Sequence, residues 1–215
     1  MSDEQDTEAE DIIHRREQRE EDSALLEAVG AFHEHGVFMP SRTIYMGSVT
    51  ANLDGESGTD AKMAEAFIKN LHVLETLGSD PITVIMDNLG GDDYHGLAIY
   101  DAIKASPCEV TIVARGYAMS MGSIILQAAK HRVMGARAAQ MLHYGTMAIN
   151  SHTKNVKRWS DESERVSEWM ECMYLERINQ RHPAFDLEQL RKMLAYDTIL
   201  TAEQSIDLGL ADRIG

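Results

Sequence analysis

The sequence predicts a single domain of the α/β class. Two short runs, 82–86 and 110–114, are apolar and rich in β-branched residues, which is typical of buried strands. Segments with helical spacing of apolar residues lie before and after these runs, so strands and helices alternate along the chain. The chain has 215 residues, 44% of them hydrophobic, which is enough for one such domain with a sizeable core.

The beginning of the chain is acidic. Residues 2–22 are rich in Asp, Glu and Gln and poor in core-forming residues, which predicts a mobile, disordered extension over residues 1–23 and a folded domain over 24–215. Two roles stay open for this extension: a solubilising tail, and a regulatory or docking arm. From Ala24 to Phe32 the apolar residues have helical spacing, so we expect a short amphipathic helix that docks on the core.

The middle of the chain alternates between loop, helix and strand. A cluster of Asn, Asp and Gly over 50–59 predicts a loop ahead of a helix at 61–77. The strand 82–86 follows, and further on the strand 110–114 leads into a helix lined with small residues at 123–129.

The stretch 155–180 has apolar residues on one face at helical spacing, and Pro183 limits its end, so we expect one long helix. Two interpretations stay open. Such a helix either buries Trp159 and Trp169 against its own sheet or projects towards a partner. Beyond it, Thr201–Gln204 predicts a capping box at the start of a final helix.

A serine stands among small and apolar residues in the segment Gly116–Gly122, where the second predicted strand gives way to a helix. A sharp turn at this point would hold the Ser120 hydroxyl clear of its neighbours. It would also point the N–H of Met121 towards the group that the serine attacks. Ser120 is therefore a candidate nucleophile.

A serine hydroxyl is a poor nucleophile at neutral pH, so it needs a base, an orienting acid and donors for an oxyanion. His143 follows the strand-like run 140–142 and is the candidate general base. Asp197 lies on the ordered approach to the final helix and can orient the imidazole. Gly91, in the glycine pair after the first strand, can supply an N–H that joins that of Met121 at an oxyanion.

Each of these residues also has a plainer interpretation. Taken singly, Ser120 suits a helix N-cap, His143 a strand-end residue bonded to a carbonyl, and Asp197 a capping acid. A glycine pair by itself indicates only a turn.

Several separate blocks of the sequence, in order, resemble the proteolytic subunit of the Clp protease, the ClpP family (peptidase S14). They are Ile44–Gly47, Asn88–Gly91 with Gly96–Asp101, Ala118–Gly122, Met141–His143, and Asp197–Ala202 with Gly209–Asp212. The resemblance covers roughly Arg42 to the C-terminus. It implies Ser120 as nucleophile, His143 as base, Asp197 as orienting acid, and the N–H groups of Gly91 and Met121 as the oxyanion hole.

The resemblance also implies a fold and a function. The fold is ClpP/crotonase-like, with stacked β-sheets, surrounding helices and a projecting handle helix in the region of about 150–185. The function is that of an ATP-dependent Clp-type serine endopeptidase subunit, which needs no metal and no organic cofactor. Its substrates are peptides or unfolded proteins, and its partners are copies of itself in a ring, a heptamer that can stack, and an AAA+ unfoldase. Enclosure in a ring keeps a generic nucleophile away from folded proteins.

Departures from the family pattern indicate a divergent member. Leu89 stands where the family usually has proline, Met119 replaces a small alanine beside the nucleophile, and Tyr144-Gly145 replaces Gln-Pro. Ala195-Tyr196 stands where the family often has an Asp-Arg pair that links stacked rings. The number of rings is therefore left open.

Three alternatives stay beside the leading function. A stand-alone ClpP-like processing protease, such as one for virus head maturation, keeps the chemistry without the unfoldase. A catalytically silent ring or scaffold partner does not need the Ser120, His143 and Asp197 set. An acyl-CoA enzyme of the crotonase superfamily shares the fold but gives no reason for a serine triad.

Charge and composition exclude other classes. The formal net charge is −15 and there is no basic stripe, which argues against binding to nucleic acid or anionic membranes. The sequence has no apolar run long enough to cross a bilayer and no secretory signal, so we expect a cytoplasmic protein. Cys108 and Cys172 lack metal-ligand spacing, so neither a zinc site nor a disulfide framework is expected.

Overall fold

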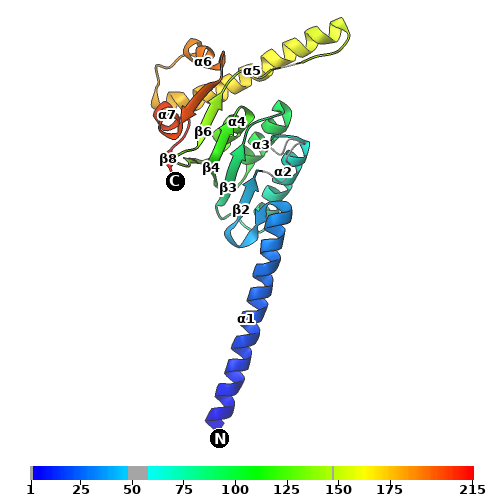
Figure 1. Ribbon diagram of the computed structural model, residues 1–215, viewed down its shortest axis with the longest axis vertical. Helices are drawn as coiled ribbons and strands as arrows, with labels where there is room; N and C mark the ends of the chain where they lie inside the picture. The colour runs from blue at the N-terminus through cyan, green and yellow to red at the C-terminus, as the bar shows by residue number, and fades with distance from the viewer. Residues whose placement is uncertain (1, 48–57, 147) are drawn as a thin grey trace.

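The computed structural model describes residues 2–47, 58–146 and 148–215. A sheet with helices around it forms the body of the molecule, and two long helices, α1 (Ser2–His35) and α5 (Thr153–Arg181), extend away from it (Figure 1). The loop expected over residues 50–59 lies mostly outside the described residues. Among the described helices, none is both long enough and apolar enough to span a membrane.

The described strands form one mixed sheet of eight, with a branch. The main path runs in the order β1 (Val37–Phe38), β2 (Thr43–Met46), β3 (Ile82–Asn88), β4 (Val110–Met119), β5 (His131–Met134) and β8 (Arg213–Ile214). Off this path, β6 (Ala139–Leu142) pairs with β4 and β7 (Thr198–Thr201) pairs with β6. All neighbours are parallel except β1 with β2 and β6 with β7.

Strand β4 is the reason why the sheet branches. Its first half, 110–114, pairs with both β3 and β5, whereas its second half, 117–119, pairs with β6 and, at Ala118, with β3. The resemblance implies stacked sheets, and in the structure the two parts are connected through β4. The two runs predicted as strands lie in β3 and in the first half of β4, where every second side chain is buried.

Several of the helices that pack on the sheet begin where the sequence provides a capping side chain. The side chain of Asp60 accepts the Met63 N–H at the start of α2 (Ala61–Thr76), and Asp92 accepts the His95 N–H at the start of α3 (Asp93–Ala105). The predicted capping box at Thr201 is confirmed at the start of α7 (Ala202–Leu208). Every residue of α4 (Met121–Ala128) is buried, so this helix forms the centre of the core.

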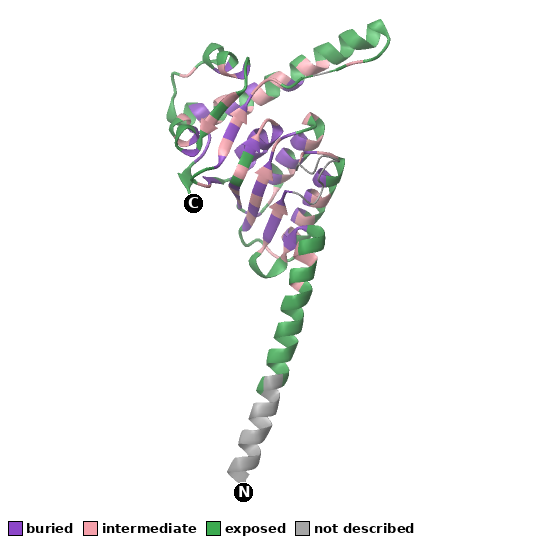
Figure 2. Ribbon diagram, viewed as in Figure 1, coloured by how far each residue is buried: buried purple, intermediate pink, exposed green. Residues whose placement is uncertain are grey.

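Helix α5 confirms the predicted long helix and decides between its two interpretations. Residues 153–161 are all exposed, and burial begins at Val166 (Figure 2). Trp159 and Trp169 are 50% and 42% exposed. The interpretation that both tryptophans are buried against their own sheet is therefore wrong. The first part of α5 projects from the body and carries apolar side chains into solvent.

Helix α1 lies where the sequence predicts a disordered extension followed by a short helix. The structure has one helix over Ser2–His35, in which the expected short helix is the last part. Glu, Gln, Arg and Ala favour helix, and Arg16 donates to Glu20 one turn later. All side chains from 16 to 27 are exposed, so local preferences and not tertiary packing hold this part of the helix. The boundary between residues 23 and 24 stays a prediction.

Helix α1 contacts the body at its C-terminal end. The ring of Phe32 meets the rings of Phe38 and Tyr45 edge-on, with centroids 5.8 and 6.3 Å apart. Asn70 of α2 donates to the carbonyl of His35, the last residue of α1.

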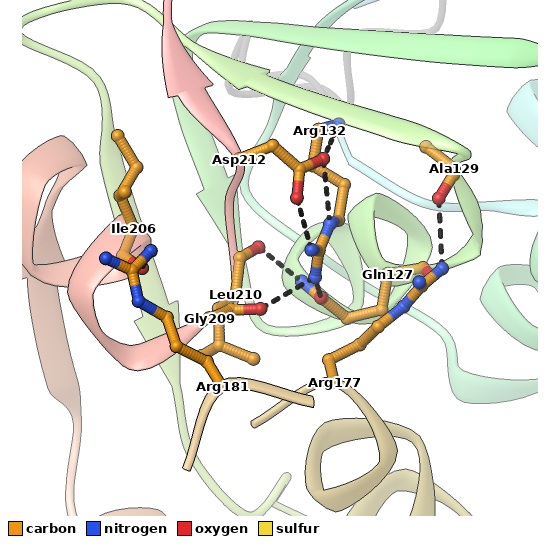
Figure 3. Close-up of polar contacts among 9 residues, drawn as sticks. All are labelled: Gln127, Ala129, Arg132, Arg177, Arg181, Ile206, Gly209, Leu210 and Asp212. Carbon is orange, nitrogen blue, oxygen red and sulfur yellow. Dashed lines mark hydrogen bonds and ion pairs between the residues drawn. The ribbon is translucent and has the colours of Figure 1, made fainter. Parts of the chain in front are cut away.

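A polar cluster around Arg132 fastens the C-terminal segment, which includes helix α7 and β8, to the body (Figure 3). The Arg132 guanidinium, 6% exposed, pairs with the Asp212 carboxylate and donates to Gln127 and to the carbonyl of Gly209. Arg177 of α5 donates to two carbonyls at the end of α4. Gln127 of α4 donates to the carbonyl of Leu210, and Arg181 of α5 donates to the carbonyl of Ile206, so α4, α5 and β5 together hold the last segment of the chain.

We expect Asp212→Asn to lower stability by about 2 kcal/mol at pH 7, because it leaves a buried guanidinium without its counter-charge. The expected loss of stability is smaller than for a fully buried ion pair, since solvent partly screens the Asp212 carboxylate. Burial pushes the pKa of Asp212 up, but the hydrogen bonds and charge of Arg132 outweigh it and hold the pKa below 3.8. A carboxylate whose pKa is lower in the folded state than in the unfolded state stabilises the fold above pH 3.8. This stabilisation is lost as the pH falls through the lower pKa of the folded state.

Thermal unfolding at several pH values checks this prediction for Asp212. The advantage of the wild type over Asp212→Asn should be full at neutral pH and should shrink below pH 3.8. A constant difference across that range would contradict it.

Candidate active site

Strand register brings Ser120, His143 and Asp197 together. The parallel pairing of Met119 with Met141 places the residues after β4 and β6 at the same edge of the sheet. The antiparallel pairing of Leu142 with Thr198 then places the residue before β7 opposite the residue after β6. Three residues that are far apart in sequence therefore meet at the ends of neighbouring strands.

The turn at Ser120 is sharp, as predicted. Its backbone has φ 51° and ψ −123°, a positive φ that a residue with a side chain rarely adopts. The Ser120 N–H donates to the carbonyl of Met141 at 2.9 Å, and helix α4 begins at the next residue. Strand β6 and helix α4 thus hold this strained conformation from both sides.

The three side chains form a continuous chain of hydrogen bonds. The Oγ of Ser120 lies 2.8 Å from Nε2 of His143, and Nδ1 of His143 lies 2.9 Å from Oδ1 of Asp197. With the proton on Nδ1, the imidazole donates to Asp197 and can accept the serine proton at Nε2. The arrangement can therefore generate a nucleophilic serine.

The acid of this chain is open to solvent. The Asp197 side chain is 68% exposed and that of His143 is 22% exposed. A solvent-exposed pair of this kind contributes little energy by itself. The orientation of the imidazole therefore depends on the backbone segments that carry the two residues.

The glycine pair lies directly against the serine turn. A Cβ added to Gly90 would stand 2.6 Å from Cβ of Ser120 and 3.0 Å from the nitrogen of Met121. Contacts this short exclude any side chain at this position, and φ of +100° favours glycine as well. The loop after β3 can approach the start of α4 only because residue 90 has no side chain.

The two N–H groups expected at an oxyanion lie at this junction. Met121 is the first residue of α4, so its N–H has no carbonyl partner within the helix. The pairing of this loop with Thr59 uses the carbonyl of Gly90 and the N–H of Asp92, and not the N–H of Gly91. In the described residues, no hydrogen bond is made by the N–H of Gly91 or of Met121. Both groups can therefore donate to a bound oxygen.

Asn88 shapes this loop, a role that the sequence reasoning missed. Its side chain is fully buried, its Oδ1 accepts the Gly90 N–H at 2.7 Å, and its Nδ2 lies 3.0 Å from Oγ1 of Thr59. The sequence does offer one indication of this role: Asn88 is a polar residue at the end of a largely apolar strand, two positions before the glycine pair.

A cavity of about 460 Å³ opens beside His143. It lies between the start of α3, the segment after β6 and the middle of α5, and its wall includes Trp159, Met170 and Leu194. This volume is in the range of pockets that hold a ligand or a substrate side chain. Sequence reasoning did not locate it, because its walls come from three distant segments.

Asp93 adds a carboxyl group to the wall of this cavity. Burial raises the pKa of Asp93, as does the negative charge of Asp92, while His143 opposes the change. No group of three or more His, Cys, Asp and Glu side chains is placed to hold a metal ion in the part of the chain that the structure describes.

The fold and the site define an α/β protein with a serine, a histidine and an aspartate aligned at the ends of adjacent strands. Comparison with known protein families gives a match: the Clp protease family model matches residues 50–215 of the chain. The chain therefore belongs to the Clp protease family.

Curated relatives agree with the family match. The chain is 27% identical over 159 residues to "ATP-dependent Clp protease proteolytic subunit 2" of Pseudomonas aeruginosa, which covers 73% of this chain and 77% of that protein. It is 30% identical over 170 residues to "ATP-dependent Clp protease proteolytic subunit 3" of Rhodococcus jostii, covering 77% and 80%.

A solved structure confirms the fold class. A mutant of ClpP1 from Listeria monocytogenes matches with a TM-score of 0.70 and 23% identity, over 82% of this chain and 92% of that one. At this identity the likeness concerns the fold alone, which is the ClpP/crotonase-like fold expected from the sequence.

Proposed function

We propose that the protein is a serine endopeptidase of the Clp type, with Ser120 as nucleophile, His143 as general base and Asp197 as orienting acid. The observation that carries this proposal is the hydrogen-bonded chain through the three side chains, at 2.8 and 2.9 Å. A scaffold without activity would have no need for this alignment.

The reaction follows from the geometry. His143 takes the proton of Ser120 as the serine oxygen attacks the carbonyl carbon of a peptide bond, and then gives it to the leaving amine. The acyl-enzyme is hydrolysed by a water molecule that His143 activates. Asp197 keeps the imidazole in the tautomer that this sequence of transfers needs. The chemistry uses neither a metal nor an organic cofactor.

The oxyanion of each tetrahedral intermediate is stabilised by the N–H groups of Gly91 and Met121. Both come from backbone that is already fixed, so they need no rearrangement during the reaction. The N-terminus of α4 adds the positive end of a helix dipole. The cavity beside His143 receives a side chain of the bound peptide.

Self-association into a ring is part of the proposal. Tyr117 of β4 and Ile199 of β7 are 44% and 62% exposed, and the register through β6 places them on one face of the sheet. Apolar side chains in such a position favour a protein partner. A heptamer, possible stacking of two rings, a cytoplasmic location and an AAA+ unfoldase that feeds unfolded proteins are the further expectations from the family.

Labelling with a fluorophosphonate tests the proposed nucleophile. This reagent reacts with an activated serine and does not require the right peptide sequence. We expect intact mass to show one adduct on the wild-type chain and none on Ser120→Ala, with peptide mapping that places the adduct on Ser120. Absence of an adduct on a folded, assembled wild-type protein would contradict the proposal, as would an adduct that persists in Ser120→Ala.

A further inference from the structure

We propose that Glu171 of the long helix α5 is a positioning residue that holds both His143 and Asp197 in line with Ser120, through Tyr144 and Arg191. This inference rests on the proposed serine peptidase function. It adds a residue outside the triad and connects the projecting helix to the site.

Glu171 is a charged residue in the buried face of α5. It is 4% exposed, on the same face as Tyr174 and Ile178, which are also buried. Its two carboxylate oxygens accept two hydrogen bonds from the Arg191 guanidinium, Nε to Oε1 at 2.8 Å and Nη2 to Oε2 at 3.0 Å. A buried carboxylate of this kind must be fully paired, and removal of the carboxylate group leaves its partners without their acceptor.

The first partner, Tyr144, connects Glu171 to the general base His143. The hydroxyl of Tyr144, the residue directly after His143, also donates to Oε1 of Glu171. The N–H of the same Tyr144 donates to the carbonyl of Leu194 at 2.8 Å. Backbone and side chain of Tyr144 are thus both fixed, which limits the movement of the imidazole next to it.

The second partner, Arg191, connects Glu171 to the segment that carries the orienting acid Asp197. Arg191 and Leu194 belong to α6 (Leu187–Leu194), and Asp197 follows this helix after two residues. The ion pair of Arg191 with Glu171 fastens α6 to α5. The hydroxyl of Thr198 donates to the carbonyl of Met193 at 2.7 Å and closes the connection between α6 and β7.

The protonation states of Glu171 and Tyr144 favour a hydrogen bond between them that persists at neutral pH. The hydrogen bonds from Arg191 hold the pKa of Glu171 below its ordinary value, against the effect of burial. Burial, together with the hydrogen bond to Glu171, raises the pKa of Tyr144 to about 12. At neutral pH, the tyrosine is therefore a donor and the glutamate a charged acceptor.

The site needs such a support because Asp197 is 68% exposed. A mobile, solvated carboxylate orients an imidazole poorly, and a small displacement of either residue separates Nε2 of His143 from the serine oxygen. The two segments that carry His143 and Asp197 meet at Glu171, so one residue on α5 fixes their relative position.

The rate constant of fluorophosphonate labelling at Ser120 tests this role. It is measured at room temperature on the full-length protein, with melting temperature and sedimentation recorded for each variant. We expect Glu171→Leu to label at least about tenfold more slowly and Tyr144→Phe about fivefold more slowly, because the imidazole loses its fixed position. The double variant should be no slower than Glu171→Leu, since Tyr144 acts through Glu171. Glu171→Gln keeps the shape and an acceptor oxygen, so it should recover most of the rate.

The matched control is Glu188→Gln on α6, whose exposed ion pair with Lys192 does not lead to the site; it should label like the wild type. Tyr144→Phe removes one oxygen atom and is the decisive variant if Glu171→Leu does not fold. Labelling at the wild-type rate by folded Tyr144→Phe, or by Glu171→Leu with only a lower melting temperature, would overturn the positioning role and leave the proposed function intact. A wild-type chain that takes no adduct would overturn both.

Discussion

Replacing Ser120 by Ala is expected to lower the rate of peptide cleavage by at least about 10⁴-fold and to leave folding unchanged. The substitution removes only the hydroxyl oxygen, whose hydrogen bond to Nε2 of His143 is the contact that the reaction uses. The residual rate would come from the oxyanion donors and from substrate binding alone. Cleavage of a set of short fluorogenic peptides, normalised to the folded fraction, measures the effect.

His143→Ala provides the internal comparison. Residues that act as one unit give losses that do not add, so the double variant Ser120→Ala, His143→Ala should be about as slow as either single one. Circular dichroism and sedimentation should match the wild type for all three. Cleavage by Ser120→Ala at the wild-type rate would show that the hydrolysis has another source.

Much of the fold could be predicted because the core strands carry a strong local signal. The apolar β-branched runs in β3 and β4 are buried as their composition suggests, and the capping box at Thr201 begins a helix as its residue types require. The serine turn could be placed because Ser120 stands among small and apolar residues between the predicted strand 110–114 and the predicted helix 123–129, and the structure has Ser120 directly between β4 and α4.

Other features depend on contacts between distant segments, which no local pattern encodes. The buried position of Glu171 could be suspected only from a charge at helical spacing with Tyr174 and Ile178, and its partners come from two other elements. Charge composition alone did not indicate the helical conformation of α1. The same Glu and Arg side chains that lower hydrophobicity also favour helix and pair along it, as Arg16 and Glu20 do.

The proximity of His143 and Asp197 is an intermediate case. His143 follows a strand-like run and Asp197 precedes a predicted helix, but only the antiparallel register of Leu142 with Thr198 brings the two side chains together. Register between distant strands follows from tertiary packing. The resemblance to the Clp protease family supplied this information in place of a physical derivation.

Gly90→Ala is expected to reduce peptide cleavage by about 10²-fold or more, although residue 90 has no functional group. The added methyl would stand 2.6 Å from Cβ of Ser120, 2.9 Å from the carbonyl oxygen of Met119 and 3.0 Å from the nitrogen of Met121. The loop after β3 must then move away from the start of α4, which displaces the nucleophile and separates the two proposed oxyanion donors. Backbone strain at φ of +100° adds a loss of stability of about 1–3 kcal/mol.

Gly78→Ala separates strain from displacement. Gly78 also has a positive φ, +147°, but a Cβ added there meets no atom within 4 Å. This variant should lose stability through strain alone and retain full cleavage at room temperature, whereas Gly90→Ala should lose both. Peptide cleavage and thermal unfolding of the two variants, side by side, decide the matter. Equal rates of cleavage by Gly90→Ala and Gly78→Ala would mean that the glycine loop does not hold the serine turn. That result would also contradict the proposed role of the Gly91 N–H as an oxyanion donor.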